Sequence, residues 1–158
     1  MTRGVLKFEF PSDREVVITR IFDAPREMVF KVSTNPDLIP LWWGPKRFTT
    51  TVERMDVKPG GVWRFIQRDQ GGNEYAFSGV YREIVPPKQE VHTFEFAGMP
   101  GHVILETSTF EEFKGKTKLI VTDLFQTVED RDGMFNSGMK EGATESMDRL
   151  EELLKKQK

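Results

Sequence analysis

Six segments between residues 48 and 126 alternate apolar and polar side chains, and only short turns separate them. The links, among them DQGGN and AGMPG, are rich in Gly, Pro, Asn and Asp, the residues that tight turns favour. Parallel strands need a crossover of about a dozen residues or more, so strands joined this briefly are sequential antiparallel neighbours. The sequence therefore predicts an antiparallel meander with strands at 48–57, 61–69, 73–85, 89–97, 102–113 and 117–126.

Helical patterns lie on both sides of this meander. A β-branched strand at 14–22 leads into two short helices, at 23–34 and 35–44. A long helix is expected over 131–156, where apolar residues recur at steps of three and four. Its apolar stripe consists of Phe135, Met139, Ala143, Met147, Leu150 and Leu154. A twisted antiparallel sheet that curves around this helix buries the stripe, so we predict an α+β domain of that architecture.

The composition limits the class of protein. A length of 158 residues suits a single domain covering 1–158, and a net charge of −2 offers no broad attraction to nucleic acid or to anionic membranes. The absence of cysteine excludes disulfides, thiol nucleophiles and cysteine-based metal sites. No apolar run approaches the ~18 residues of a membrane span, and the N-terminus lacks a signal-peptide pattern. We therefore expect a cytoplasmic protein that neither binds nucleic acid nor inserts into a membrane.

Alternation also assigns the inner face of the central strands. The charged side chains of Arg64 and Arg68 mark the solvent face of one strand, and Thr93 and Glu95 mark that of another. The residues between such positions then face the long helix: Trp63, Phe65, Gln67, Tyr75, Phe77, Tyr81, His92, Phe94 and Phe96. This inner face predicts a cavity wall that is mostly aromatic.

Turn geometry sets the register of the last two strands. A two-residue turn at 115–116, with Gly first, suits type II′ and pairs Phe110 with Val121 and Ser108 with Asp123. If Val121 faces inward, its cross-strand neighbours and the residues two positions along face inward as well.

The preceding hairpin brings His92 and Glu106 together. A loop centred on Met99 pairs Phe94 with Ile104 and His92 with Glu106, on the same inner face. A buried imidazole and a buried carboxylate are costly unless they are paired or wet. The pair is therefore a handle for a polar ligand, an internal hydrogen bond or a general acid–base pair.

Stronger catalytic and metal-binding patterns are absent from the sequence. Ser108, His92 and Asp123 have the residue types of a hydrolytic triad, but no Gly-x-Ser-x-Gly elbow surrounds the serine. His92 and His102 lack the spacing of a zinc motif. We therefore expect no metal and no cofactor, and we assign no catalytic residue.

Trp42 and Trp43 stand at the end of the second short helix, next to Gly44 and Pro45. Adjacent residues on a helix point about 100° apart. We therefore expect one of the two rings to pack in the core and the other to lie at the mouth of the cavity.

Four stretches carry a family resemblance: FDAPREMVFKVSTNPDLIPLWWGP, DVKPGGVWRF, GGNEYAFSGVYREIVPPKQEVHTFEF and STFEEFKGKTKLIVTDLF. They resemble the START-like superfamily and, within it, the activator of heat-shock protein 90 ATPase homologue-like proteins. The resemblance covers about 15–156 and leaves 1–13 as an N-terminal extension. It implies a helix-grip fold with a cavity between the sheet and the last helix. It also implies one of several roles: binding of lipids or other hydrophobic ligands, enzymatic activity, or a co-chaperone function.

We predict that the protein binds a hydrophobic or amphipathic small molecule between the curved sheet and the long helix. The candidate ligand-binding residues are Trp42, Trp43, Trp63, Phe65, Phe77, Tyr81, His92, Phe94, Phe96, Glu106, Ser108, Phe110, Phe135, Met139 and Met147. Two alternatives stay open: a co-chaperone that contacts heat-shock protein 90 through its surface, and an enzyme that converts a small hydrophobic substrate with His92 and Glu106. Self-association into a homodimer stays open as well.

Overall fold

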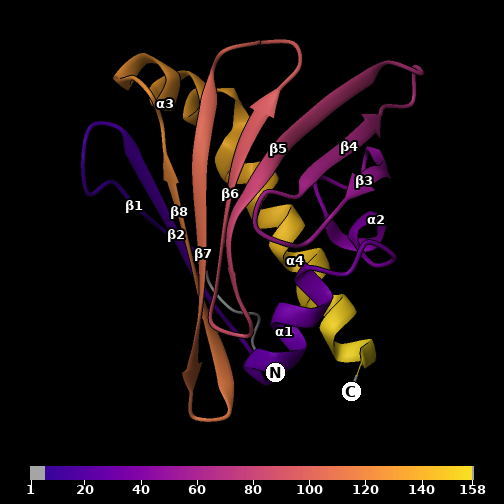
Figure 1. Ribbon diagram of the computed structural model, residues 1–158, viewed down its shortest axis with the longest axis vertical. Helices are drawn as coiled ribbons and strands as arrows, with labels where there is room; N and C mark the ends of the chain where they lie inside the picture. Colours follow the sequence, from indigo (N-terminus) through magenta and orange to yellow (C-terminus); the bar gives the residue numbers. More distant parts are fainter. Residues whose placement is uncertain (1–5, 158) are drawn as a thin grey trace.

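The computed structural model describes residues 6–157, which form a curved sheet around a long C-terminal helix (Figure 1). Neighbouring strands are antiparallel throughout, in the order β1-β2-β8-β7-β6-β5-β4-β3. The predicted meander is confirmed as β3 to β8, and the sheet stays open because β1 and β3 lie at its two edges. The strands are β1 (Lys7–Glu9), β2 (Glu15–Phe22), β3 (Thr49–Met55), β4 (Val62–Arg68), β5 (Glu74–Val85), β6 (Gln89–Phe96), β7 (Val103–Phe113) and β8 (Lys116–Leu124).

The edge strand β1 is the element that the sequence pattern did not reveal. It lies within the stretch 1–13, of which residues 1–5 are outside the described part of the chain. Phe8 stands opposite Ile18 of β2. A strand of three residues is too short for alternation to be recognised, so the stretch carried no strand signal.

The helices lie on the concave side of the sheet (Figure 1). Arg149 of the long helix donates hydrogen bonds to the backbone carbonyl oxygens of Gly44 (2.7 Å) and Pro40 (3.4 Å), which fixes the segment after the second short helix. None of the helices within residues 6–157 is long and apolar enough to cross a membrane. The helical elements are α1 (Arg26–Ser33), α2 (Ile39–Trp42), α3 (Val128–Met134), the π-helical turn η1 (Phe135–Met139) and α4 (Lys140–Gln157).

The predicted long C-terminal helix is confirmed as α4, but this helix begins at Lys140 rather than at 131, because a kink separates it from α3. Ser137 and Gly138 leave the helical region of backbone angles, and Gly138 has φ +99°. Glycine adopts this conformation at little cost. The Ser137 hydroxyl donates to the carbonyl oxygens of Gly133 (2.8 Å) and Met134 (3.0 Å), which satisfies acceptors at the end of α3.

The register of the last hairpin differs from the prediction by two residues. The turn is formed by Lys114 and Gly115, which both have positive φ (52° and 79°), as a type I′ turn requires. Phe110 therefore pairs with Leu119 rather than Val121. Because side chains alternate with a period of two, an even shift leaves every residue on the face that was predicted for it. In the preceding hairpin, the pairing of His92 with Glu106 is confirmed.

A buried ion pair connects the first long strand to the last helix. Arg20 of β2 is only 1% exposed, and its guanidinium lies 2.7 Å from an Asp148 oxygen and 3.2 Å from a Glu151 oxygen, both on α4. Loss of one partner from such a pair leaves an uncompensated buried charge and costs about 3–5 kcal/mol. The pair therefore fixes where α4 lies on the sheet.

Candidate ligand-binding cavity

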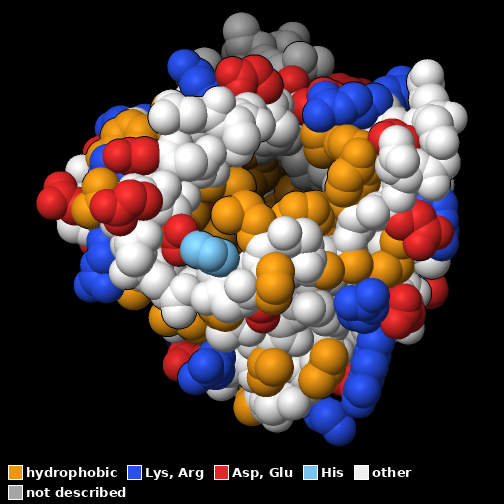
Figure 2. All heavy atoms as spheres, turned by 90° about the horizontal axis from the view of Figure 1, so that it is seen from above, with side chains coloured by type: hydrophobic (Ala, Val, Ile, Leu, Met, Phe, Trp, Pro, Cys, Tyr) orange, Lys and Arg blue, Asp and Glu red, His pale blue; other side chains and the backbone are white. Residues whose placement is uncertain are grey.

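A cavity of about 450 Å³ lies between the inner face of the sheet and the helices that cover it. Its wall combines residues of β4 to β8 with residues of α2, η1 and α4. Figure 2 views the molecule from above and shows a hollow at the upper end of the molecule, with hydrophobic side chains inside it. The volume falls within the range of about 300–1,000 Å³ that is typical of sites for small molecules.

Five rings on one side of the cavity form what we call the aromatic cluster: Trp43, Trp63, Phe65, Phe77 and Phe94. The Trp43 ring meets the rings of Phe65 and Phe77 edge-on, with centroids 5.0 and 5.4 Å apart. This geometry is the favourable one for aromatic pairs. The indole nitrogen of Trp63 donates to the carbonyl oxygen of Thr93 at 3.0 Å, so the polar atom of this buried ring is satisfied.

Both tryptophans of the Trp42-Trp43 pair lie on the cavity wall. The expectation that only one of them faces the cavity assumed that both are helical. Trp43 instead follows the last residue of α2 and has extended backbone angles (φ −73°, ψ 120°), so the 100° helical rotation does not separate the two rings. The Ser146 hydroxyl of α4 donates to the Trp42 carbonyl oxygen (3.0 Å) and accepts from the Gly44 amide (3.1 Å).

The helical side of the wall is formed by flexible and small apolar side chains. Met139 and Met147 line the cavity as the sequence places them, and the structure adds Met134, Ala143 and Leu150. Methionine adapts to ligands of different shape because its side chain is unbranched and polarisable.

Two candidate residues, Phe96 and Phe135, do not line the cavity. Phe96 stands at the end of β6, where its ring stacks on Phe77 (centroids 5.2 Å apart) instead of facing α4. Phe135 lies before the kink, which changes the phase of the helical stripe. Its ring packs against Phe8 and Phe10, with centroids 6.0 and 5.1 Å away.

Opposite charges meet in the part of the wall formed by β6, β7 and β8. We call Glu90, His92, Glu106 and Asp123 the carboxylate cluster. The His92 Nε2 lies 3.1 Å from a Glu106 oxygen, and its Nδ1 hydrogen-bonds to Glu90. Burial alone lowers the pKa of His92, but the hydrogen bonds and charges of Glu106 and Glu90 outweigh burial and raise this pKa to about 10. His92 is therefore an imidazolium that donates one hydrogen bond to each carboxylate.

Asp123 completes the cluster on β8, opposite Glu106. Burial raises the pKa of Glu106, but the hydrogen bond and charge of His92 lower it overall to about 2. Burial and the neighbouring Glu106 charge raise the pKa of Asp123 well above its usual value. No N–H or O–H group within residues 6–157 donates to the buried Oδ1 of Asp123. Two adjacent carboxyl groups do not both ionise, so Asp123 holds a proton and shares it with the Glu106 carboxylate.

The other polar candidates line the same wall. Ser108 lies on β7, two residues from Glu106, and Tyr81 lies on β5 opposite His92. Burial raises the pKa of the Tyr81 hydroxyl, which therefore stays neutral. The part of the chain that the structure describes contains no group of three or more acidic or histidine side chains that could hold a metal ion.

The sequence profile of one protein family, described as Activator of Hsp90 ATPase homolog 1-like protein (AHSA1), matches residues 23–155. The chain belongs to this family. No curated protein sequence matches the AHSA1-family chain closely enough to be recognised.

Solved structures with the same helix-grip fold come from several bacteria. A protein from Rhodobacter sphaeroides is 21% identical, with a TM-score of 0.90 over 98% of this chain and 100% of that chain. A Mycobacterium smegmatis protein is 22% identical, with a TM-score of 0.85 over 96% and 97%. A Silicibacter pomeroyi protein called AHSA1 is 20% identical, with a TM-score of 0.76 over 91% and 99%. At these identities the likeness establishes the AHSA1-family fold alone.

The charged residue of the cavity that sequence reasoning missed is Glu90. It is two positions before His92 on β6 and so has the same inward parity. Alternation alone was enough to find it. A charged side chain usually faces solvent, but the His92 imidazolium compensates the charge of Glu90 inside the AHSA1-family cavity.

Proposed function

We propose that this AHSA1-family protein binds a predominantly hydrophobic small molecule in the cavity between the sheet and α4. The observation that supports the proposal is the cavity itself, a space of about 450 Å³ with a mostly apolar wall that includes the carboxylate cluster. Such a combination of apolar area and a few convergent polar groups is what small-molecule sites share.

The energetics favour a ligand that fills this space. Each 100 Å² of apolar ligand surface that leaves water contributes about 2.5 kcal/mol. Association costs at least about 4 kcal/mol of lost translational and rotational freedom. A ligand of two or more fused rings, or of comparable chain length, therefore binds measurably, whereas a very small one does not.

Mass spectrometry under native and then denaturing conditions tests whether a ligand accompanies the purified protein. We expect a mass excess that disappears on denaturation. The location is tested with the neutral fluorescent probe N-phenyl-1-naphthylamine. The substitution Ala143→Trp places an indole inside the cavity and should weaken probe binding at least tenfold. Ala97→Trp makes the same change at an exposed position and should leave binding unchanged. Equal binding by both variants would place the probe elsewhere.

A role as a partner of heat-shock protein 90 is a second candidate, and the family match is the observation that favours it. An assay of chaperone ATPase activity with and without the protein tests it directly. The third reading, catalysis by His92, gains no support from the geometry. Both ring nitrogens of His92 already donate to carboxylates, so neither is available to take a proton from a substrate.

A further inference from the structure

We propose that the ligand carries a hydrogen-bond donor, a hydroxyl or a protonated amine, which binds the Glu106 carboxylate, and that the cavity rejects carboxylates and phosphates. This inference rests on the proposed function, because it names the chemical class of ligand for the same cavity.

The charges on the wall argue against an anionic ligand. The titratable wall residues are Glu90, His92, Glu106, Asp123 and Tyr81, and no lysine or arginine lines the cavity within residues 6–157. A buried anion needs a cation or several N–H donors, because it loses its hydration on binding. The carboxylate cluster instead contains three carboxyl groups and a single imidazole.

Two basic side chains on the inner face of the sheet are already engaged. His92 donates one ring N–H to Glu90 and the other to Glu106. Arg20 is paired with Asp148 and Glu151 on α4. Each would have to break an existing ion pair before it could bind an anionic ligand.

Glu106 is the acidic group of the cluster that a ligand can reach. Its side chain is 27% exposed, compared with 14% for His92 and 9% for Glu90. Because Glu106 lines the cavity, this exposed surface faces the space that a ligand would fill. A carboxylate offers about four lone-pair positions. His92 uses one and the shared proton of Asp123 uses another, so the remaining positions can accept hydrogen bonds from a ligand.

The aromatic cluster defines the other end of the ligand. It adjoins the carboxylate cluster where the rings of Trp63 and His92 lie 5.5 Å apart at 86°. A molecule with its donor group on Glu106 therefore extends its apolar part toward Trp63 and Trp43. The fitting ligand is an amphiphile whose polar end is neutral or cationic.

Four naphthalenes that differ in one substituent test this selectivity by displacement of N-phenyl-1-naphthylamine. They are 2-naphthalenemethanol, 2-naphthylmethylamine, 2-methylnaphthalene and 2-naphthoate. A hydrogen bond to a charged acceptor is worth about a tenfold gain in affinity or more. We expect the alcohol and the amine to bind at least about tenfold more tightly than 2-methylnaphthalene. We expect 2-naphthoate to bind at least about tenfold more weakly than 2-methylnaphthalene.

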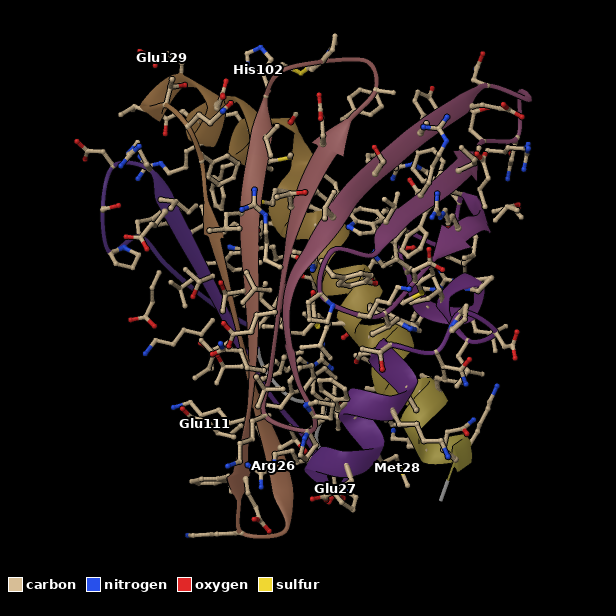
Figure 3. The ribbon with its side chains drawn as sticks, in the orientation of Figure 1. Arg26, Glu27, Met28, His102, Glu111 and Glu129 are labelled. Carbon is tan, nitrogen blue, oxygen red and sulfur yellow. The ribbon has the colours of Figure 1, made fainter. Side chains whose placement is uncertain are left out.

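The substitution Glu106→Gln assigns the preference to one side chain. It removes the charge while keeping the shape, so the advantage of the amine over 2-methylnaphthalene should fall about tenfold. Binding of 2-methylnaphthalene in this variant reports that the cavity still forms. Glu111→Gln is the matched control on the same strand. Glu111 is exposed and lies at the lower end of the sheet, away from α4 (Figure 3). This control should keep the wild-type preference.

The outcomes separate this inference from the proposed function. The donor inference is overturned if 2-methylnaphthalene displaces the probe but the alcohol and the amine bind no more tightly than it does. It is also overturned if 2-naphthoate binds as tightly as the alcohol and the amine. In both cases the cavity remains a binding site. Retention of the full preference by Glu106→Gln also overturns the donor inference. If none of the four compounds displaces the probe, both proposals fail.

Discussion

The aromatic cluster and the carboxylate cluster share strand β6 and touch through Trp63 and His92, yet different forces hold them in place. Each aromatic ring contacts at least two other rings of the cluster, and an aromatic pair is worth about 0.5–1.5 kcal/mol beyond the area it buries. In the carboxylate cluster, the charge of each group depends on its neighbours: Glu106 and Glu90 raise the pKa of His92, and the Glu106 charge raises the pKa of Asp123. The comparison implies that the aromatic cluster tolerates conservative changes, whereas the carboxylate cluster fails when one member is lost.

The largest effect is expected for His92→Leu. This change leaves Glu90 and Glu106 buried beside each other without their shared cation, and we expect a loss of about 3–5 kcal/mol in the free energy of unfolding. Urea denaturation measures it. His102→Leu is the control, because His102 projects from the end of the β6–β7 hairpin (Figure 3). Its side chain is 51% exposed and pairs with Asp130, so this change should cost less than about 1 kcal/mol. Equal losses would contradict the comparison.

The pH dependence of stability is the next effect in size. The groups around His92 are Glu90, Glu106, Asp123 and Tyr81. Because the pKa of His92 is raised from 6.5 to about 10 on folding, its contribution is fully present below pH 6.5 and is lost as the pH rises through 10. The raised pKa of Asp123 acts in the same direction. The His92 proton alone should therefore lower the stability by up to about 1.4 kcal/mol per pH unit between pH 7 and 10.

Urea midpoints at several pH values measure this slope. His92→Gln cannot hold the proton, so its stability should vary less over the same range. A wild-type protein whose stability stays constant from pH 7 to 10 would show that His92 is not the imidazolium of the cluster.

A smaller effect is expected on the aromatic side of the comparison. Trp63→Phe keeps a ring at a position that is only 3% exposed, but it removes the hydrogen bond to the Thr93 carbonyl oxygen and some volume. We expect a loss of about 1–2 kcal/mol in unfolding free energy, with the probe still bound. A loss as large as that of His92→Leu would show that the aromatic cluster is no more tolerant than the carboxylate cluster.

The smallest effect concerns the helical wall that faces both clusters. Gly138→Ala meets no atom within 4 Å but forces a side chain into a backbone conformation with φ +99°. It should cost about 1 kcal/mol. Gly133→Ala is the control, since Gly133 lies within α3 and also has free space around it. Alanine should stabilise that position by up to about 1 kcal/mol. Thermal unfolding of both variants measures the sign of each change in stability. A change of the same sign in both variants would contradict the kink.

Most of the fold could be predicted from the alternation of apolar and polar residues, because the two faces of a strand follow from a period of two residues. The predicted register of the last hairpin was wrong by two positions, yet Phe110 and Ser108 still line the cavity, since an even shift preserves the face. The sequence also paired His92 with Glu106, because a loop centred on Met99 gave a register whose inner face agreed with that of the next hairpin.

The remaining features depend on backbone geometry that a residue pattern does not contain. Helical spacing runs from Phe135 through Met139 without interruption, so the pattern gave no sign of the kink at Gly138 that turns Phe135 away from the cavity. The place of Trp43 depends on where α2 ends, which tertiary contacts with α4 decide. The proton on Asp123 follows from burial next to Glu106, which sequence spacing alone does not reveal.

The ion pair between Arg20 and Asp148 joins residues that are 128 positions apart. Strand β2 therefore acquires its partner on α4 only after more than a hundred further residues have been synthesised. Until then, the inner faces of β4 to β7 expose their rings to water, since the helix that covers them has not yet been made. The order of synthesis makes the nascent chain, rather than the finished protein, the form most exposed to aggregation.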